Sequence, residues 1–220
     1  MVVVCLCRAG VLSIKEKKRS YGSTAYYIVG EARPSYLLSK LYTLYYKADT
    51  LLDACDLVPQ RGSIYSEEGR RHRFKAARFD QHRRKADFEI RTASVSRQEI
   101  TLPPLTQDAL SALYALRVLR LKQGERLSIP VFDSGRLYRV ALTGGRIEAV
   151  KSGIGLVDAQ RVDMAITDSR GQAAGRSLAV WLSADRRQVP VQLKAELAVG
   201  SFVLRLREAR GLLPERARSR

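Results

Sequence analysis

The sequence predicts a mainly β protein, an antiparallel meander curled into a partly open or closed barrel with two short helices. Three observations lead to this fold class. Apolar and polar residues alternate along many short segments, as in strands with one buried face. Turn-forming residues separate these segments, and Asp133-Ser134-Gly135 is a strong hairpin connector. No linker or change in composition divides the 220 residues, so we expect one domain.

The residue pattern of the N-terminal part of the chain predicts strands interrupted by one helix. Val11–Arg19 and Ala25–Arg33 flank the turn residues Ser20–Thr24 and form a hairpin pattern. Pro34 suits a helix entrance, and the apolar spacing that follows predicts a short helix over Ser35–Leu44. Further strands are expected at Tyr45–Leu52, at Leu57–Glu67 with a bulge at Arg61-Gly62, at Arg70–Phe79 and at Lys85–Ala93.

A second helix and a long meander follow. Pro103-Pro104 breaks the sheet, Thr106 or Asp108 can cap a helix, and helical spacing continues through Leu110–Arg117. Gly144-Gly145 is expected to separate two of the later strands. Those strands are predicted at Leu127–Phe132, Arg136–Leu142, Arg146–Lys151, Leu156–Ile166, Arg176–Leu182, Val189–Ala198 and Ser201–Glu208.

The predicted barrel-like domain spans residues 11–210. Residues 1–10 are expected to be a truncated or frayed N-terminus, because Val2–Leu6 has the pattern of a strand interrupted by a start codon. Met1–Cys7 is apolar, but no charged segment precedes it and it is shorter than a secretory h-region, so the sequence as given has no export signal. Residues 211–220 are a basic tail that we expect to be disordered.

The formal net charge of +17 and the pI near 10.2 direct attention to anionic partners. Basic residues are dispersed along the chain, and the densest run is Arg70–Arg91. Alternate residues of a strand share a face, so Arg71, Arg73 and Lys75 are expected on an exposed side, with Phe74 and its alternate neighbours on the core side. The alternative is a patch that contacts phosphate, lipid head groups or another acidic surface. Its candidate residues are Arg71, Arg73, Lys75 and Arg84.

No catalytic or cofactor signature is present. The three cysteines include no Cys-x-x-Cys pair and the chain has two histidines, so neither a metal site nor a cofactor is expected. Phosphate-binding glycine loops and the Gly-x-Ser-x-Gly elbow are both absent. No apolar run approaches the ~18 residues of a membrane helix. We therefore assign no catalytic residue and expect a protein that is not an enzyme.

Tyrosines crowd the first quarter of the chain, and they have two interpretations. They can line a ligand cavity in the mouth of a barrel, or they can complete a core whose edge meets solvent. On the second predicted helix, Tyr114 and Arg117 are expected to project toward the sheet. The candidate cavity residues are Tyr26, Tyr45, Tyr114 and Arg117.

Three motifs carry a family resemblance. They are the helix Asp108–Arg117, the Pro-Val-x-Asp-x-Gly hairpin at 130–135, and Trp181-Leu182 followed by Asp185 and Pro190-Val191. In this order and spacing the chain resembles the bacterial family of domain of unknown function 3108, from about Val11 onward. The resemblance implies a barrel-like antiparallel sheet, an exported or periplasmic location, and no assigned activity. The sequence departs from the family at its start, where the usual signal peptide is missing.

Two functions follow from these observations. The first is an envelope-associated, non-enzymatic β-domain that binds an apolar or amphipathic ligand, such as a lipid-like small molecule, or a partner protein of the envelope. The alternative is a basic nucleic-acid or anionic-surface binder that uses the Arg70–Arg91 hairpin, with nucleic acid the less favoured of these partners. An enzyme of unrecognised type is a third class.

Overall fold

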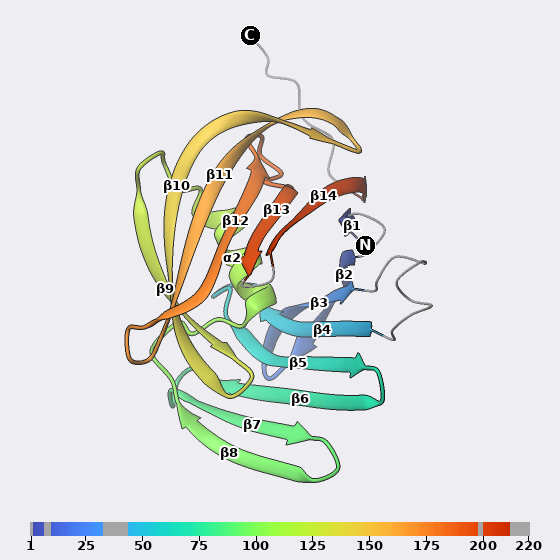
Figure 1. Cartoon of the computed structure of the whole chain (residues 1–220). Coiled ribbons are helices and arrows are strands. Elements are labelled where there is room, and N and C mark those ends of the chain that lie inside the picture. The colour runs from blue at the N-terminus through green and yellow to red at the C-terminus, as the bar shows by residue number, and fades with distance from the viewer. Residues whose placement is uncertain (1, 7–9, 33–43, 198–199, 212–220) are drawn as a thin grey trace.

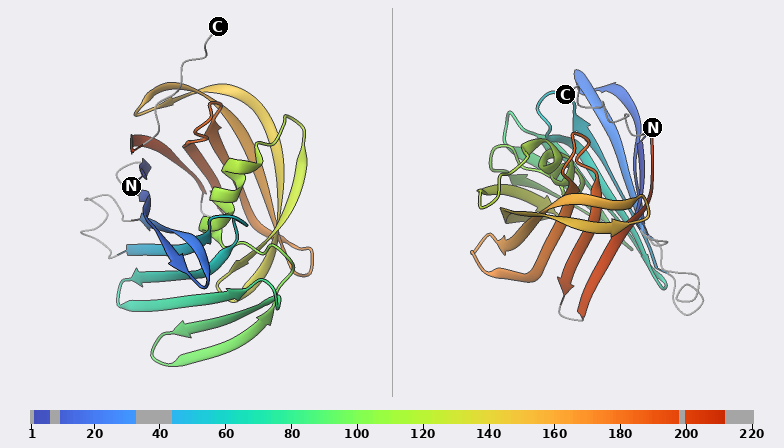
Figure 2. Two further views of the ribbon diagram at one scale, coloured as in Figure 1. Left: turned by 180° about the vertical axis from the view of Figure 1, so that it is seen from behind. Right: turned by 90° about the horizontal axis from the view of Figure 1, so that it is seen from above.

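The computed structural model describes residues 2–6, 10–32, 44–197 and 200–211. Its strands follow one another as a meander and curve around one helix, α2 (Ala109–Leu119), which lies inside the sheet (Figures 1 and 2). The strands are β1 (Val2–Leu6), β2 (Gly10–Ser20), β3 (Ser23–Ala32), β4 (Leu44–Asp53), β5 (Pro59–Glu68), β6 (Arg71–Asp80), β7 (Lys85–Arg91), β8 (Val95–Thr101), β9 (Arg126–Asp133), β10 (Arg136–Ser152), β11 (Gly155–Asp168), β12 (Ala173–Ser183), β13 (Pro190–Leu197) and β14 (Gly200–Arg210).

All the described strands belong to one antiparallel sheet. Its order runs from β8 back to β1, crosses to β14, and continues from β14 back to β9. The sheet is not closed, because β8 and β9 stand at its two ends. The predicted antiparallel barrel is confirmed in its partly open form. β10 and β11 arch across one end of it (Figure 1).

β1 joins the two halves of the sheet. Val4 lies opposite Leu12 of β2 on one side and opposite Ala209 of β14 on the other. This part of the segment expected to be frayed is therefore a strand. Of the predicted tail, all but Gly211 lies outside the described residues, as does the predicted helix over Ser35–Leu44 apart from Leu44, which begins β4.

Three elements differ from the sequence prediction. β8 was not predicted, because its residues are mostly polar and lie on an exposed strand. Gly144-Gly145 does not end a strand: β10 continues through it as a bulge, since the register with β11 shifts between Gly144 and Ile147. The bulge expected at Arg61-Gly62 lies one residue earlier, because Leu51 pairs with Arg61 and Leu52 with Pro59.

The core packs against α2 on the inside of the curved sheet. Asp108 caps the helix: its carboxylate accepts from the Ser111 amide at 2.8 Å, and the Ser111 hydroxyl accepts from the Asp108 amide at 2.8 Å. Thr106, the other expected cap, donates instead to the Pro103 carbonyl. One buried cluster surrounds Tyr114, and a second surrounds Leu116. A third core, built around phenylalanines, lies between β6, β7 and β9 and consists of Ala77, Phe79, Ala86, Phe88, Leu102 and Phe132.

Candidate functional site

A row of basic side chains lies on the inner face of β6. Ala77 and Phe79 are buried in the phenylalanine core, and β6 pairs with both neighbours without a register shift. Alternate residues share a face, so Arg71, Arg73 and Lys75 lie on the same inner face as Ala77 and Phe79. The expectation that this basic face points away from the core was wrong. Alanine and phenylalanine occur on both faces of β6, so the contact of Phe79 with Phe132 of β9 decides which face is buried.

The outer end of this row forms a surface groove of about 460 Å³. Within the described residues, none of its three arginine side chains has a hydrogen bond or an ion pair. Glu68, which lies opposite Arg71 on β5, accepts instead from the Tyr46 hydroxyl. We call this feature the basic groove, and it is lined by Arg70, Arg71, His72, Arg73, Thr92 and Ala93.

The inner end of the row reaches a small cavity of about 50 Å³, which we call the inner pocket. It lies between β4–β7, the start of α2 and the β9–β10 turn, and its walls include Ala77, Phe88 and Leu110. Lys75 also lines it and donates to the Ser134 hydroxyl at 2.9 Å. A cavity of this size holds a few water molecules, whereas ligand pockets usually enclose about 300–1,000 Å³. The inner pocket is therefore too small to enclose a whole ligand of that kind.

Asp108 places an unpaired oxygen against this pocket. Oδ1 accepts from Ser111, while Oδ2 is buried and has no hydrogen-bond partner of normal geometry in the described part of the chain. The inner face of β5 is close to it: a Cβ built on Gly62 would lie 2.7 Å from Oδ2. Burial raises the pKa of the Asp108 carboxyl, and its polar contacts with Ser111, Thr50 and Leu110 oppose this only in part.

We expect Asp108→Asn to remove part of the pH dependence of stability. Because the folded pKa of Asp108 is raised, its contribution is fully present below the unfolded pKa and declines as pH rises through the folded value. Asparagine keeps an acceptor for Ser111 and carries no charge. In urea unfolding measured from acidic to neutral pH, the free energy of unfolding of the variant should therefore rise relative to that of the wild type as pH rises.

Asp185→Asn is the matched control with the opposite sign. Burial raises the pKa of Asp185, but hydrogen bonds from Ser183 and Arg187 outweigh it and lower the pKa overall. The contribution of Asp185 is present above its unfolded pKa and is lost as pH falls, so this variant should lose stability relative to the wild type as pH rises. Parallel pH profiles for Asp108→Asn and the wild type would contradict the assignment.

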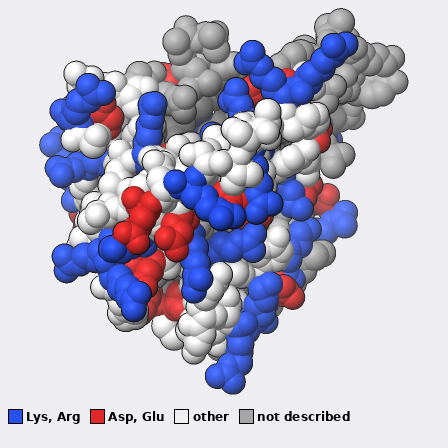
Figure 3. Space-filling view, turned by 90° about the horizontal axis from the view of Figure 1, so that it is seen from below, with Lys and Arg blue, Asp and Glu red and all other residues white. Residues whose placement is uncertain are grey.

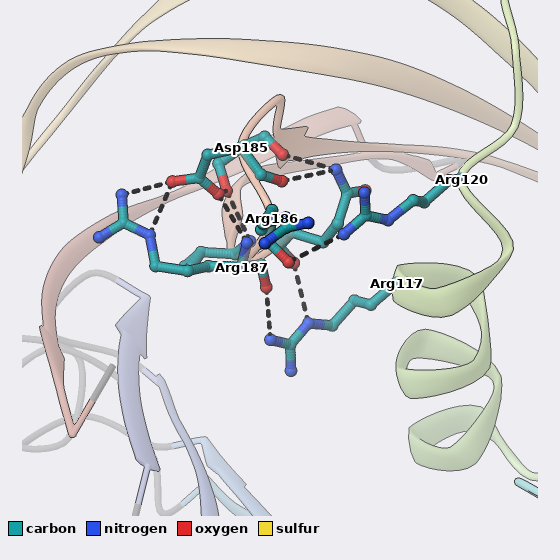
Figure 4. Close-up of polar contacts among 8 residues, drawn as sticks. Arg117, Arg120, Asp185, Arg186 and Arg187 are labelled. Carbon is teal, nitrogen blue, oxygen red and sulfur yellow. Dashed lines mark hydrogen bonds and ion pairs between the residues drawn. The ribbon is translucent and has the colours of Figure 1, made fainter. Parts of the chain in front are cut away.

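Three of the four candidate cavity residues meet in the interior, and they do so away from the inner pocket. Tyr114 is 8% exposed in its core cluster, and Tyr26 packs against the same cluster. The Arg117 guanidinium lies 5.1 Å from the Tyr114 ring centroid and donates to the carbonyls of Arg187 and Gln188, each at 2.8 Å (Figure 4). These contacts tie α2 to the β12–β13 loop.

The remaining candidate residues lie elsewhere. Tyr45 is on the outer face of β4, where its ring meets Tyr65 edge-on at 6.2 Å. Arg84 lies in the β6–β7 turn, at the opposite end of that hairpin from Arg71. The structure therefore brings together Arg71, Arg73 and Lys75 and leaves Arg84 apart from them.

Two groove residues and one pocket residue were missed from the sequence. Arg70 belongs to the same basic run, which was a usable signal. Thr92 reaches the basic groove because the β7–β8 hairpin turns beside the start of β6, and Ser134 reaches Lys75 because the β9–β10 turn packs inside the sheet. Neither contact has a local sequence pattern.

In the part of the chain that the structure describes, no group of three or more His, Cys, Asp or Glu side chains is arranged to hold a metal ion. None of its helices is long and apolar enough to cross a membrane.

Comparisons with known proteins agree with this architecture. The crystal structure of a beta-barrel-like protein of domain of unknown function DUF1849 from Brucella abortus is similar, with a TM-score of 0.59 and 13% sequence identity over 94% of each chain. At this identity the likeness shows the fold alone. No curated protein matches the sequence. The model of the family described as protein of unknown function (DUF3108) matches residues 8–207, and the chain therefore belongs to the DUF3108 family.

Proposed function

We propose that this protein is a non-enzymatic binding protein of the cell envelope that takes an amphipathic ligand with an anionic group. The arginines of the basic groove bind the anionic group, and the apolar part lies along the inner face of the sheet toward the inner pocket. One observation carries the proposal: Arg71 and Arg73 have no partner in the described structure and share a strand face with the core residues Ala77 and Phe79.

The position of these arginines favours an anion. A guanidinium binds carboxylate or phosphate through paired N–H donors, and such charge-assisted hydrogen bonds are about twice as strong as neutral ones. Neighbouring side chains on one face of a strand are roughly 6.6–6.8 Å apart, so Arg71 and Arg73 can hold one anionic group between them. Lys75 already donates to Ser134, so Arg71 and Arg73 are the donors of the row that have no partner among the described residues.

The size of the inner pocket limits how the ligand lies. About 50 Å³ encloses only the end of an apolar chain, so the rest of the ligand would lie on the open concave surface. Affinity then depends mainly on the anionic group. His72 is exposed, and its Nδ1 lies 3.2 Å from the Tyr65 hydroxyl on the outer face, the opposite face from the one that Arg71 and Arg73 share.

We expect dodecyl phosphate to bind the full chain in isothermal titration calorimetry, with the neutral dodecyl maltoside binding at least tenfold more weakly. The double variant Arg71→Ala/Arg73→Ala should weaken dodecyl phosphate binding at least tenfold, because a charged hydrogen bond contributes about 1.5–3 kcal/mol. Arg170→Ala, at an exposed arginine in the β11–β12 turn, is the matched control and should bind as the wild type does. Equal binding of both amphiphiles would contradict the proposal.

Nucleic acid is the alternative partner, and the charge distribution favours it less. Seen from below, Lys and Arg side chains are spread over the surface with Asp and Glu among them (Figure 3). On the outer face of the Arg70–Arg91 hairpin, Glu89 pairs with both Arg91 and Arg97. Strong retention on a single-stranded DNA column that falls steeply with salt and with Arg71→Ala/Arg73→Ala, in the absence of dodecyl phosphate binding, would support nucleic acid instead.

A further inference from the structure

β8 presents an open edge at one end of the sheet. It pairs with β7 on one side, and no described strand pairs with its other side. The opposite end of the sheet is protected, because Gln107 donates to the Pro130 carbonyl and accepts from the Phe132 amide of β9. β8 is exposed along its length except for the half-buried Ile100. An exposed edge of this kind is a template for another strand.

The pairing with β7 shows which backbone groups are free. The Leu102 amide donates to the Arg84 carbonyl and the Thr92 amide donates to the Ser94 carbonyl, so the even-numbered residues of this hairpin arm bond toward β7. Backbone groups of a strand point alternately to its two sides. The N–H and C=O groups that point away from β7 are therefore those of Val95, Arg97, Glu99 and Thr101.

This edge is complementary to itself. When β8 pairs antiparallel with β8 of a second copy around Gln98, Arg97 lies opposite Glu99 of that copy and Glu99 lies opposite its Arg97. Val95 likewise lies opposite Thr101. Shifting the register by two residues keeps the hydrogen bonds but places Arg97 opposite Arg97, or Glu99 opposite Glu99, which is destabilising. Of these three registers, the one around Gln98 both pairs the free backbone groups and places opposite charges across from each other.

The charges already present on β7 extend this pattern. Glu99 accepts from Lys85 at 2.6 Å, and Arg97 donates to Glu89 at 2.6 Å. All four side chains lie on the outer face of the sheet. Across the joined sheets, Glu99 of one copy, ion-paired with its own Lys85, would meet Arg97 of the other copy, which is ion-paired with its own Glu89. Asp87 lies opposite Glu99 on β7, so Arg97 of a second copy would add a positive charge beside these two carboxylates.

We propose that β8 is a docking edge for a second copy of this chain, forming a two-fold dimer in which the two sheets join through antiparallel β8 strands. Such an interface is isologous, since the same residues face one another in both directions. The proposal is independent of the proposed ligand, because the basic groove and the inner pocket are formed within one copy.

Analytical ultracentrifugation of the full chain over a concentration series tests the dimer. In a dimer of Arg97→Glu, the introduced glutamate of each copy faces Glu99 of the other. In a dimer of Glu99→Arg, the introduced arginine of each copy faces Arg97 of the other. Each variant alone should raise the dimer dissociation constant at least tenfold. Mixing the two variants should restore dimers. The introduced glutamate at position 97 of one variant then faces the introduced arginine at position 99 of the other, and the unchanged Glu99 of the first faces the unchanged Arg97 of the second.

Arg83→Glu, at the exposed Arg83–Asp80 pair of the β6–β7 turn, is the matched charge-reversal control and should dimerise as the wild type does. Circular dichroism of each variant separates loss of the dimer from loss of the fold. In the wild-type dimer, hydrogen exchange should be slowed at the Val95, Arg97, Glu99 and Thr101 amides. A wild type that stays monomeric at every concentration, or single reversals that dimerise normally, would overturn the proposal.

Discussion

Gly144→Ala should lower the free energy of unfolding by about 2–4 kcal/mol. A Cβ built at this position would lie 2.1 Å from the Lys122 carbonyl oxygen, which is backbone and cannot rotate away. The same segment is held by two backbone hydrogen bonds, from the Gly124 amide to the Gly144 carbonyl and from the Gly144 amide to the Glu125 carbonyl. Relieving the overlap therefore requires the 122–125 turn to move off β10.

Urea unfolding, with the transition extrapolated linearly to water, measures this effect. Gly30→Ala is the matched control in another strand of the same sheet. Its Cβ would meet the Leu110 side chain at 3.3 Å, and a leucine methyl can adjust. We expect a change within about 1 kcal/mol for that control, since alanine also reduces the entropy of the unfolded chain. Equal effects for the two variants would show that β10 does not need its close approach to the turn.

Tyr114→Ala should cost about 3–5 kcal/mol, the range found when a buried aromatic side chain is truncated in a core. Tyr114 is 8% exposed and belongs to the cluster that joins α2 to both halves of the sheet, with Ile28 on one side and Trp181 on the other. The truncation also removes the ring beneath Arg117. Burial raises the pKa of the Tyr114 phenol, so the hydroxyl is neutral across the physiological range.

Two control variants accompany Tyr114→Ala. Tyr114→Phe keeps the ring and should retain most of the stability. Tyr21→Ala removes a tyrosine that is 54% exposed, and its cost should stay below about 1 kcal/mol. The two interpretations of the tyrosines separate here: a structural Tyr114 lowers the urea midpoint when truncated, whereas a tyrosine that only lines a cavity would leave it nearly unchanged.

Local pattern was sufficient for most strands and for their turns. Asp133-Ser134-Gly135 was expected to connect a hairpin, and it does so with positive φ at Ser134 and Gly135, as a type I′ turn requires. Asp108 caps α2 because a short acceptor side chain at that position satisfies free amides within one helical turn. Such signals are local, so they can be found without knowledge of the fold.

The sequence predictions that were wrong or missing concern residues whose structure depends on a neighbouring strand or on the core packed against them. β8 has no apolar alternation, and it is a strand because β7 supplies its hydrogen bonds. Gly144-Gly145 has the composition of a turn, yet β11 continues alongside it and converts it to a bulge. Arg71 and Arg73 alternate as an exposed face would, but the phenylalanine core lies on their side of β6.

By itself, then, the sequence determined the antiparallel β class, the order of most strands, the capped helix and the excess of basic residues, because alternation and turn chemistry act between near neighbours. The tertiary structure alone decided which face of each strand is buried. That choice placed Arg71 and Arg73 at the mouth of the concave face, put Tyr114 and Arg117 in the helix–sheet junction, and left the edge of β8 open. These are contacts between segments far apart in the chain, and the packing of α2 inside the curved sheet sets them.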